Sequence, residues 1–244
     1  MDISAVCFDI DGTLYPHRAT LLRLIGSIFP SPRLAFHYQR FRSRIRRQPQ
    51  VETIPADREG FRRRQTSSIL KTMGKKPTQP ALARMEARIE RQMYASWRST
   101  FAQLTPYPGV REAFEMIRSN GLRIGVLSDF PVERKLETLK VADLVDVSCC
   151  TEDCGYLKPN AAPFFHIARK MGVECHQVLY VGDSYRKDVV GASQAGMYTC
   201  LIVPKRRTRR LFVNLRKRFP LADMICTDYK EFQELFKTKF HGGI

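Results

Sequence analysis

The sequence predicts an α/β protein, a doubly wound parallel sheet with a helical segment inserted after its first strand. Short apolar runs rich in Val, Ile, Leu and Cys alternate with segments of helical period along most of the chain. Parallel strands covered by helices on both faces have this pattern. The alternation stops between about residues 17 and 105, where prolines separate helix-forming segments and β-branched runs are almost absent.

Each predicted strand is a short apolar run that ends at polar residues. Four are well marked, and they cover residues 3–9, 123–129, 177–183 and 198–203; a weaker one covers 144–150. Helices are predicted at 109–120 and 161–171, each followed by a glycine suited to a helix C-terminus. These elements assign residues 1–16 and 106–244 to one α/β domain.

The insertion, residues 17–105, is predicted to be a helical domain of its own. Its amphipathic segments cover residues 21–29, 36–47, 61–73 and 81–97. No internal repeat is visible.

The charge of the chain is unusual and unevenly distributed. The 244 residues include 41 Lys and Arg against 24 Asp and Glu, a formal net charge of +17. Residues 16–105 hold 19 of the bases and 5 acids, and the run 204–220 holds 8 bases and no acid, so the rest of the chain is mildly acidic. The excess predicts attraction to a polyanion: a phosphorylated substrate, nucleic acid or an acidic membrane surface.

Two interpretations of these basic segments stay open. The insertion could form an anion funnel, and the 204–220 run, which contains Leu211, Phe212 and Leu215, could be a basic amphipathic helix that binds a polyanion. Alternatively, both are solvated faces whose apolar stems pack on the protein.

Other classes of protein are disfavoured. No stretch approaches the roughly 18 to 20 apolar residues of a transmembrane helix. The N-terminus carries acids where a signal peptide carries bases, so a cytoplasmic protein is expected. The seven cysteines are odd in number, and Cys149, Cys150 and Cys154 lack a suitably spaced partner pair for zinc, so reduced thiols are expected.

The first strand ends in FDIDGTLYP, which contains two aspartates at a spacing of two. An extended backbone points Asp9 and Asp11 to the same side, and Gly12 allows a tight turn around a bound anion. Two such carboxylates repel each other unless a cation or a shared proton lies between them. The alternative is an ordinary Asp-Gly turn after a strand.

Three later segments add polar groups near strand ends. Ser128 ends the second strand, although Ser-Asp is also a helix cap, and Lys158 precedes Pro159, although a lone lysine is normally a surface charge. Asp183 ends another strand, and Asp188 follows one helical turn and a residue later. Ligands of open α/β sheets bind at this edge, and an all-oxygen acidic set suits Mg²⁺.

In this order the motifs resemble the haloacid dehalogenase (HAD) superfamily of phosphotransferases. They are DIDGT at 9–13, Ser128 at a strand end, Lys158 in KPN, and GDSYRKD at 182–188. The resemblance covers about residues 1–16 and 106–204 and implies a Rossmann-like fold, with the insertion similar to a helical C1-type cap. FDIDGTLYP and PGVREAF are also similar to the pyrimidine-nucleotidase-like and phosphoglycolate-phosphatase-like branches.

The resemblance also implies residue roles. Asp9 would be the nucleophile that forms an aspartyl-phosphate, and Asp11 the general acid and then the base. The phosphoryl group would be held by Ser128, Lys158, Gly12 and Thr13. Mg²⁺ would be held by Asp9, the backbone carbonyl of Asp11, and Asp183, with Asp188 as a supporting partner or a ligand through water.

The implied function is a Mg²⁺-dependent phosphatase of small phosphomonoesters, such as a nucleotide or a sugar or organic phosphate. A dehalogenase of this superfamily needs neither a metal nor the second aspartate. Two alternatives remain: a nucleic-acid end phosphatase, suggested by the charge, and a polyanion-binding protein that uses the fold as a scaffold.

Three further residues carry expectations about the surroundings of the site. Asp129 stands where many relatives have Asn, and we expect it to point toward the following helix or to form a salt bridge. His17 and Arg18 are expected near the site on the cap side.

Overall fold

The computed structural model describes residues 2–16, 31–48, 57–95, 101, 104–203 and 214–240. Its centre is a sheet of six parallel strands in the order β3-β2-β1-β4-β5-β6. The strands are β1 (Ala5–Phe8), β2 (Arg123–Ser128), β3 (Val147–Cys150), β4 (Val178–Gly182), β5 (Tyr198–Ile202) and β6 (Met224–Cys226). The doubly wound α/β prediction is confirmed, and the five predicted strands are present with narrower bounds.

The register places the carboxyl ends of the central strands side by side. Phe8, the last residue of β1, pairs with Val126 of β2 on one side and with Val181 of β4 on the other. Residues that follow β1, β2 and β4 therefore leave the sheet at the same edge. In open α/β sheets this edge is where ligands bind.

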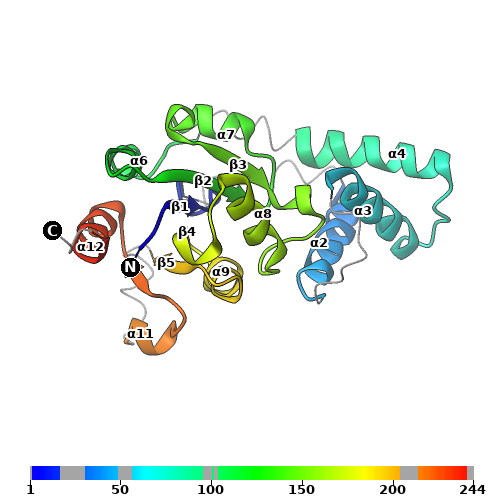
Figure 1. Cartoon of the computed structure of the whole chain (residues 1–244). Helices are drawn as coiled ribbons and strands as arrows, with labels where there is room; N and C mark the ends of the chain where they lie inside the picture. Colours follow the sequence, from blue (N-terminus) through cyan, green and yellow to red (C-terminus); the bar gives the residue numbers. More distant parts are fainter. Residues whose placement is uncertain are drawn as a thin grey trace.

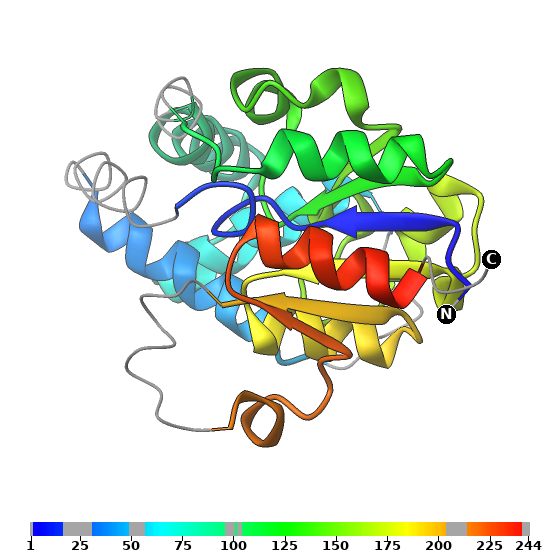
Figure 2. The same ribbon diagram turned by 90° about the vertical axis from the view of Figure 1, so that its left-hand side faces the viewer.

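One face of the sheet is covered by α6 (Val110–Ser119), α7 (Glu133–Thr138) and α12 (Tyr229–Phe240). Figure 2 shows α6 and α12 side by side in front of the strands. The ring of Phe8 lies 4.6 Å from that of Phe114 and 6.0 Å from that of Phe232. Burial of each such ring contributes roughly 1.5–3 kcal/mol, and this packing holds the end of β1 in place.

The opposite face is covered by α8 (Ala162–Met171) and α9 (Val190–Gln194). Phe164 of α8 packs edge-on against Tyr180 of β4, with ring centroids 4.8 Å apart. The shorter elements are η2 (Ala142–Leu144), η3 (Thr151–Cys154), η4 (Cys175–Gln177), η5 (Tyr185–Val189) and α11 (Leu215–Arg218).

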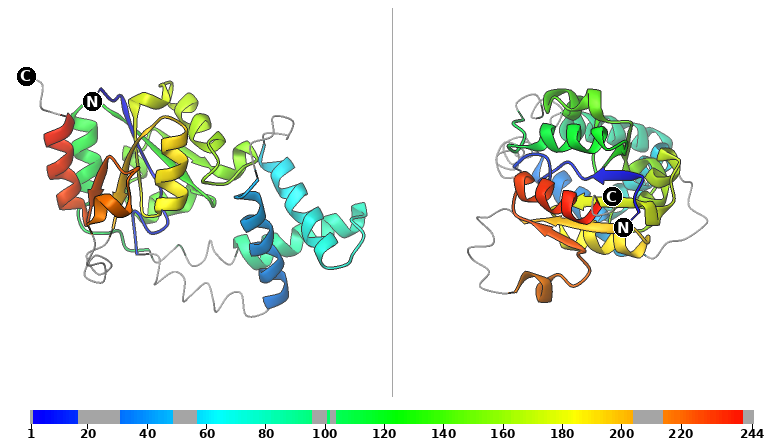
Figure 3. Two further views of the ribbon diagram at one scale, coloured as in Figure 1. Left: turned by 90° about the horizontal axis from the view of Figure 1, so that it is seen from below. Right: turned by 60° about the vertical axis from the view of Figure 1, so that its left-hand side comes forward.

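A separate group of helices lies beyond the carboxyl ends of the strands. It consists of α2 (Pro32–Ile45), α3 (Arg58–Thr72), α4 (Gln79–Ile89) and η1 (Glu90–Tyr94). Figures 1 and 3 show these helices at the end of the molecule opposite α12. They share a core that includes Leu34, Tyr38 and Ile69. We refer to these helices as the cap helices.

The cap helices overlap three of the four helices predicted in the insertion, and residues 21–29 lie outside the described residues. The domain boundaries at residues 16/17 and 105/106 remain a prediction. Within the described part of the chain, no helix has the length and apolar character needed to span a bilayer.

Candidate active site

The polar residues predicted from separate motifs meet at the carboxyl edge of the sheet. Asp9 directly follows β1, Ser128 ends β2, and Asp183 directly follows β4. Lys158 reaches the same place from the loop before α8, since its Nζ lies 2.6 Å from Asp9 Oδ1. The fold therefore brings together groups that are up to 174 positions apart in the sequence.

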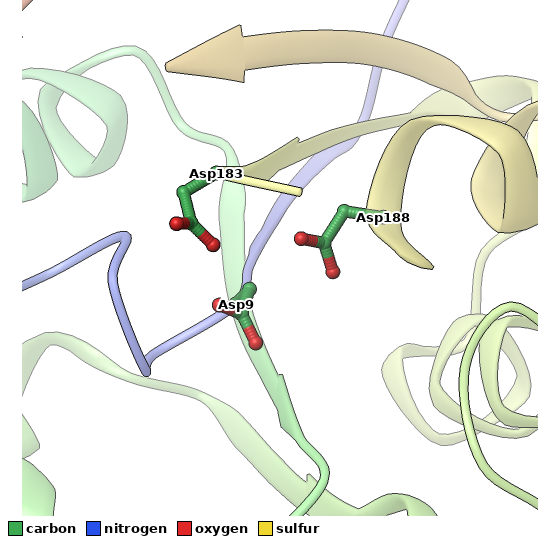
Figure 4. A group of neighbouring side chains, drawn as sticks. All are labelled: Asp9, Asp183 and Asp188. Atoms are coloured by element: carbon green, nitrogen blue, oxygen red, sulfur yellow. The ribbon is translucent and has the colours of Figure 1, made fainter. Parts of the chain in front are cut away.

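Three aspartates form an acidic cluster. Carboxylate oxygens of Asp9, Asp183 and Asp188 lie within 4.8 Å of one another, and Figure 4 shows their carboxylates converging. Hard oxygen ligands of this kind suit Mg²⁺ or a similar divalent cation. Asp188 is further fixed by the backbone N–H of Ser184, which donates to its Oδ2 at 3.0 Å.

Gly12 and Gly182 leave room for this cluster. A Cβ on Gly12 would lie only 2.6 Å from Asp183 Oδ2, and its φ of +101° is one that other residues rarely adopt. A Cβ on Gly182 would lie 2.4 Å from Asp188 Cβ. The turn at Gly12 can approach Asp183 this closely only because glycine has no side chain. The carboxylate oxygens of Asp9, Asp183 and Asp188 fit a small, hard cation.

Lys158 is a buried cation of the site. It is only 1% exposed, and its Nζ donates to Asp9 Oδ1 at 2.6 Å, Asp188 Oδ1 at 2.7 Å and the Tyr180 hydroxyl at 3.0 Å. Burial lowers the pKa of this amine, but Asp188 and Asp9 outweigh burial, so its pKa lies well above its ordinary value. The alternative of a solvated surface lysine is wrong.

Asp9 is held in place on both carboxylate oxygens. Thr13 Oγ1 donates to Oδ2 at 3.0 Å, while Lys158 occupies Oδ1. Burial raises the pKa of Asp9 to about 6, because the repulsion from Asp188 and Asp11 adds to desolvation and the attraction of Lys158 only partly opposes it. A second cation beside Asp9 would favour its charged form.

Asp11 has a different environment from Asp9. Its carboxylate accepts hydrogen bonds from the Tyr15 hydroxyl and from Ser128 Oγ, the latter at 2.9 Å. Burial raises its pKa, but Lys135, Tyr15 and Ser128 together outweigh burial and lower it below the ordinary value. The two aspartates of one motif are thus shifted in opposite directions.

Lys135 is a site residue that the sequence did not reveal. Its Nζ lies 2.7 Å from both carboxylate oxygens of Asp11, its side chain is almost fully buried, and its ammonium lies 4.4 Å from the ring centre of Phe101. It belongs to the short helix α7, whose sequence ERKLET has the charged composition of an exposed helix. Only the packing of α7 against the loop after β1 identifies it.

Asp129 forms a salt bridge, which is one of the two arrangements expected for it. Arg46 Nη1 lies 2.8 Å from Asp129 Oδ2, and Thr151 Oγ1 donates to Oδ1 at 3.1 Å. Burial raises the pKa of Asp129, but Arg46, Lys158, Lys187 and Arg42 outweigh it and hold the pKa far below its ordinary value. The Asp129 carboxylate therefore faces Arg46 of the cap helices.

Several cap arginines pair with groups of the α/β domain. Arg42 is 1% exposed, and it donates to Glu152 Oε1 at 2.6 Å and to the Asp129 carbonyl at 2.5 Å. Arg58 pairs with Asp153 at 2.6 Å. Some arginines of the cap helices therefore neither attract a free anion nor face solvent. They form ion pairs and hydrogen bonds with the α/β domain.

Some predictions fall on residues that the structure does not describe. These are His17 and Arg18, and residues 204–213 of the basic run. The prediction that a polyanion binds there remains a prediction. All seven cysteines are free thiols, and six of them are buried, as expected.

Comparison with known proteins found a matching family profile and similar curated proteins. The profile of the haloacid dehalogenase-like hydrolases matches residues 3–196. The glyceraldehyde 3-phosphate phosphatase of Methanopyrus kandleri is 32% identical over 211 residues, 82% of this chain and 84% of that protein. The phosphoglycolate phosphatase of Shigella boydii serotype 4 is 29% identical over 80% of this chain and 79% of that protein.

The fold has close counterparts among solved structures. The 2-haloacid dehalogenase from Pseudomonas syringae pv. Tomato DC3000 covers 97% of this chain and 99% of its own, with a TM-score of 0.63 at 21% identity. The β-phosphoglucomutase of Clostridium difficile has a TM-score of 0.58 at 17% identity, covering 97% of this chain and 98% of its own. Because the profile matches most of the chain, the protein belongs to the haloacid dehalogenase-like hydrolase family.

Proposed function

We propose that the protein is a Mg²⁺-dependent phosphatase of small phosphomonoesters that acts through an aspartyl-phosphate on Asp9. The observation that carries the proposal is the position of Asp9, whose carboxylate lies 2.6 Å from the Lys158 ammonium and within 4.8 Å of carboxylate oxygens of Asp183 and Asp188. The relatives named as phosphatases of glyceraldehyde 3-phosphate and phosphoglycolate support the substrate class.

Asp9 and Asp183 would hold the metal, together with the backbone carbonyl of Asp11, and Asp188 would support them. The oxygen-only donor set and the glycine that makes room for Asp183 fit this ion. When bound, Mg²⁺ supplies positive charge that offsets the repulsion between a phosphate dianion and a carboxylate nucleophile.

In the first step an Asp9 carboxylate oxygen attacks phosphorus and the bond from phosphorus to the ester oxygen breaks. Asp11 donates a proton to that leaving oxygen, because an alkoxide is a poor leaving group, and such proton transfer contributes about 10²- to 10⁴-fold. Ser128 and Lys158 would hold the phosphoryl oxygens, together with the backbone N–H groups of the Gly12–Thr13 turn.

In the second step Asp11, now a carboxylate, takes a proton from water, and the water oxygen attacks phosphorus. The bond between Asp9 and phosphorus breaks, which releases inorganic phosphate and restores Asp9. The depressed pKa of Asp11 suits this base role, and Lys135 and Tyr15 keep its carboxylate in position. The proton that Asp11 takes from water in this step is the proton that it can donate to the next leaving group.

The hydrogen bond from Ser128 to Asp11 suggests how substrate prepares the acid. Ser128 Oγ donates to Asp11 Oδ2 at 2.9 Å in the structure. A phosphoryl group that binds at Ser128 would compete for this donor, and its own negative charge would raise the pKa of Asp11. Substrate binding would therefore favour the protonated form that the first step needs.

Dehalogenation is the main competing reaction, because dehalogenases share the fold. A halide leaves as an anion and needs no proton. The contacts that hold Asp11 in place would therefore serve no step of dehalogenation. Asp11, Lys135 and Tyr15 together favour phosphate ester hydrolysis.

We also propose that residues 17–105 act as the cap of this site. Arg42, Arg46 and Arg58 attach the cap helices to loops that follow β2 and β3, at the mouth of the site. A cap in this position would shield the bound ester from bulk water and contact its leaving group.

The test is a panel of small phosphomonoesters, including phosphoglycolate and glyceraldehyde 3-phosphate, with release of inorganic phosphate as the readout. Turnover with Mg²⁺ and its loss on chelation with EDTA are expected. No phosphate release from any member in saturating Mg²⁺, or release of halide from 2-haloacids instead, would contradict the proposal. A 5′-phosphorylated oligonucleotide in the same panel tests the nucleic-acid alternative.

A further inference from the structure

A basic cavity lies at the junction between the cap helices and the α/β domain. Its volume is about 270 Å³. The residues that line it are Ser43, Arg46, Arg47, Pro159, Ser184, Arg186 and Lys187. Four of these described lining residues are basic and none is acidic, so the cavity is electropositive on both its cap side and its domain side.

Two of the residues that line the cavity are next in the sequence to groups of the site. Pro159 follows Lys158, whose Nζ contacts Asp9, and Ser184 follows Asp183 of the acidic cluster. Ser184 also donates its backbone N–H to Asp188. The loops that carry Lys158 and Asp183 therefore also form part of the wall of this cavity.

The four cations do not have equivalent surroundings. Arg46 is already occupied, since it pairs with Asp129 at 2.8 Å and donates to the Lys158 carbonyl at 2.9 Å. Arg47, Arg186 and Lys187 are exposed, and none of the three forms an ion pair with a described residue. Arg46 thus already has partners, whereas the positive charges of Arg47, Arg186 and Lys187 are not paired with any acid in the described part of the chain.

The charge of Lys187 reaches into the site. Burial raises the pKa of Asp129, and Lys187 is among the cations that outweigh burial there and lower it. Like charges that converge on one cavity repel one another, and an anion placed among them removes that repulsion. Arginine and lysine donors recognise carboxylate and phosphate through short, charge-assisted hydrogen bonds.

We infer that this cavity binds a second anionic group of the substrate, a carboxylate or a second phosphate carried by the leaving group. The inference rests on the proposed function, to which it adds a preference for phosphomonoesters that carry a second, separate anionic group. The volume is below the roughly 300–1,000 Å³ of sites for drug-sized ligands, so it suits one small charged group and not a nucleobase or a polynucleotide.

Matched substrate pairs test the inference. Phosphoglycolate and ethyl phosphate differ by one carboxylate, and glucose 1,6-bisphosphate and glucose 6-phosphate differ by one phosphate on a longer spacer. We expect kcat/KM to be at least about 10-fold higher for the doubly anionic member of at least one pair, as one charge-assisted contact supplies.

Substitutions of the lining residues test whether the preference for doubly anionic substrates comes from this cavity. Arg186→Gln and Lys187→Gln should each reduce the preference for the doubly anionic substrate about 3- to 10-fold, and the double variant should nearly abolish it. Arg47→Gln tests the cap side of the cavity. Arg40→Gln is the matched control: it removes an exposed arginine of α2 that does not line this cavity, and the preference should be retained.

Binding gives a second readout that does not depend on turnover. Calorimetry with the Asp9→Asn protein should show tighter binding of phosphoglycolate or glucose 1,6-bisphosphate than of its singly anionic partner. Adding Arg186→Gln and Lys187→Gln should remove the difference.

The two readouts separate the inference from the proposed function. Hydrolysis of both members of each pair with equal kcat/KM would overturn the inference and leave the phosphatase assignment standing. Selective binding that requires Arg186 and Lys187, without turnover of any member, would support the cavity and overturn the phosphatase. Equal binding within both pairs would overturn the inference regardless of turnover.

Discussion

The ammonium nitrogen of Lys135 lies 2.7 Å from both carboxylate oxygens of Asp11. The pair is screened from water, with the side chain of Lys135 1% exposed and that of Asp11 15% exposed. A bidentate cation of this kind fixes the carboxylate in one orientation and favours its charged form. The site thus holds two buried lysines, each matched to one aspartate of the same motif.

Replacing Lys135 with methionine keeps the length of the stem and removes the charge. We expect kcat to fall about 10- to 100-fold with KM changed less than about 3-fold, because Asp11 loses its position but the phosphate-binding groups stay. The pKa of Asp11 should rise, since Lys135 is the strongest of the groups that lower it against burial. The pH dependence of kcat measures this shift.

Lys135→Arg serves as the control for a purely structural effect, since it keeps the positive charge. It should recover part of the lost kcat and return the pH profile toward that of the wild type. Equal loss in both variants, with no change in the pH profile, would show that Lys135 only supports packing.

Asp11→Asn should separate the two chemical steps. With p-nitrophenyl phosphate, whose leaving group needs little protonation, Asp9 can still be phosphorylated, but no base then activates water. We expect a burst of about one equivalent of p-nitrophenol followed by a slow phase, and a phosphorylated protein by intact mass spectrometry. The Asp9→Asn, Asp11→Asn double variant should show neither, and an adduct in the double variant would place the phosphoryl group elsewhere.

Gly12→Ala should weaken the metal site. The added Cβ would meet Asp183 Oδ2 at 2.6 Å, so the carboxylate must move. We expect the Mg²⁺ concentration for half-maximal activity to rise about 10- to 100-fold, the range seen when groups that orient metal ligands are lost.

Gly74→Ala is the matched control for backbone strain. Gly74 also has a positive φ, +75°, but its Cβ would meet no atom within 4 Å. It should lower stability modestly and leave the Mg²⁺ requirement unchanged. A similar change in Mg²⁺ requirement in both variants would refute the role of the Gly12–Asp183 contact.

Asp129→Asn should destabilise the protein in a pH-dependent way. The folded protein holds the pKa of Asp129 below its unfolded value, so the carboxylate stabilises the fold above about pH 4 and loses this effect as the pH falls further. We expect a cost of about 3 kcal/mol at pH 7, since a nearly buried partner of Arg46 is neutralised.

Urea unfolding of wild type and Asp129→Asn across pH measures this difference. It should be constant between pH 5 and 7 and shrink by about 1 kcal/mol per pH unit below pH 4. Asp143→Asn, which removes an exposed ion pair with Arg111, should have a much smaller effect. A difference for Asp129→Asn that grows as the pH falls would contradict the assignment.

The sequence predicted the parts of the fold that have strong local patterns. The strands that end at Phe8, Ser128 and Gly182 are apolar runs followed by polar residues, and this pattern also placed Asp9 and Asp183 at the sheet edge. Strand β6 was missed because its three residues, Met224–Cys226, are too short to show a period. The α12 helix, Tyr229–Phe240, was not predicted either, although its aromatic residues complete the core.

The residues that surround the site could not be predicted, because their contacts join segments that are far apart in the sequence. Lys135 lies in a charged helix, and only the tertiary fold buries it against Asp11. Arg42 and Arg46 looked like part of a solvated or anion-attracting face, yet they pair with Glu152 and Asp129 across the junction with the cap helices. Side-chain partners far apart in the sequence cannot be read from composition or period.

The central claim is that Asp9 is the nucleophile of a Mg²⁺-dependent phosphatase. The most direct measurement compares inorganic phosphate release from phosphoglycolate, in saturating Mg²⁺, by the wild type and by Asp9→Asn, with circular dichroism to verify that both are folded. The account predicts steady turnover by the wild type and at least about a 10³-fold loss in the folded variant. Turnover by folded Asp9→Asn close to that of the wild type would contradict it.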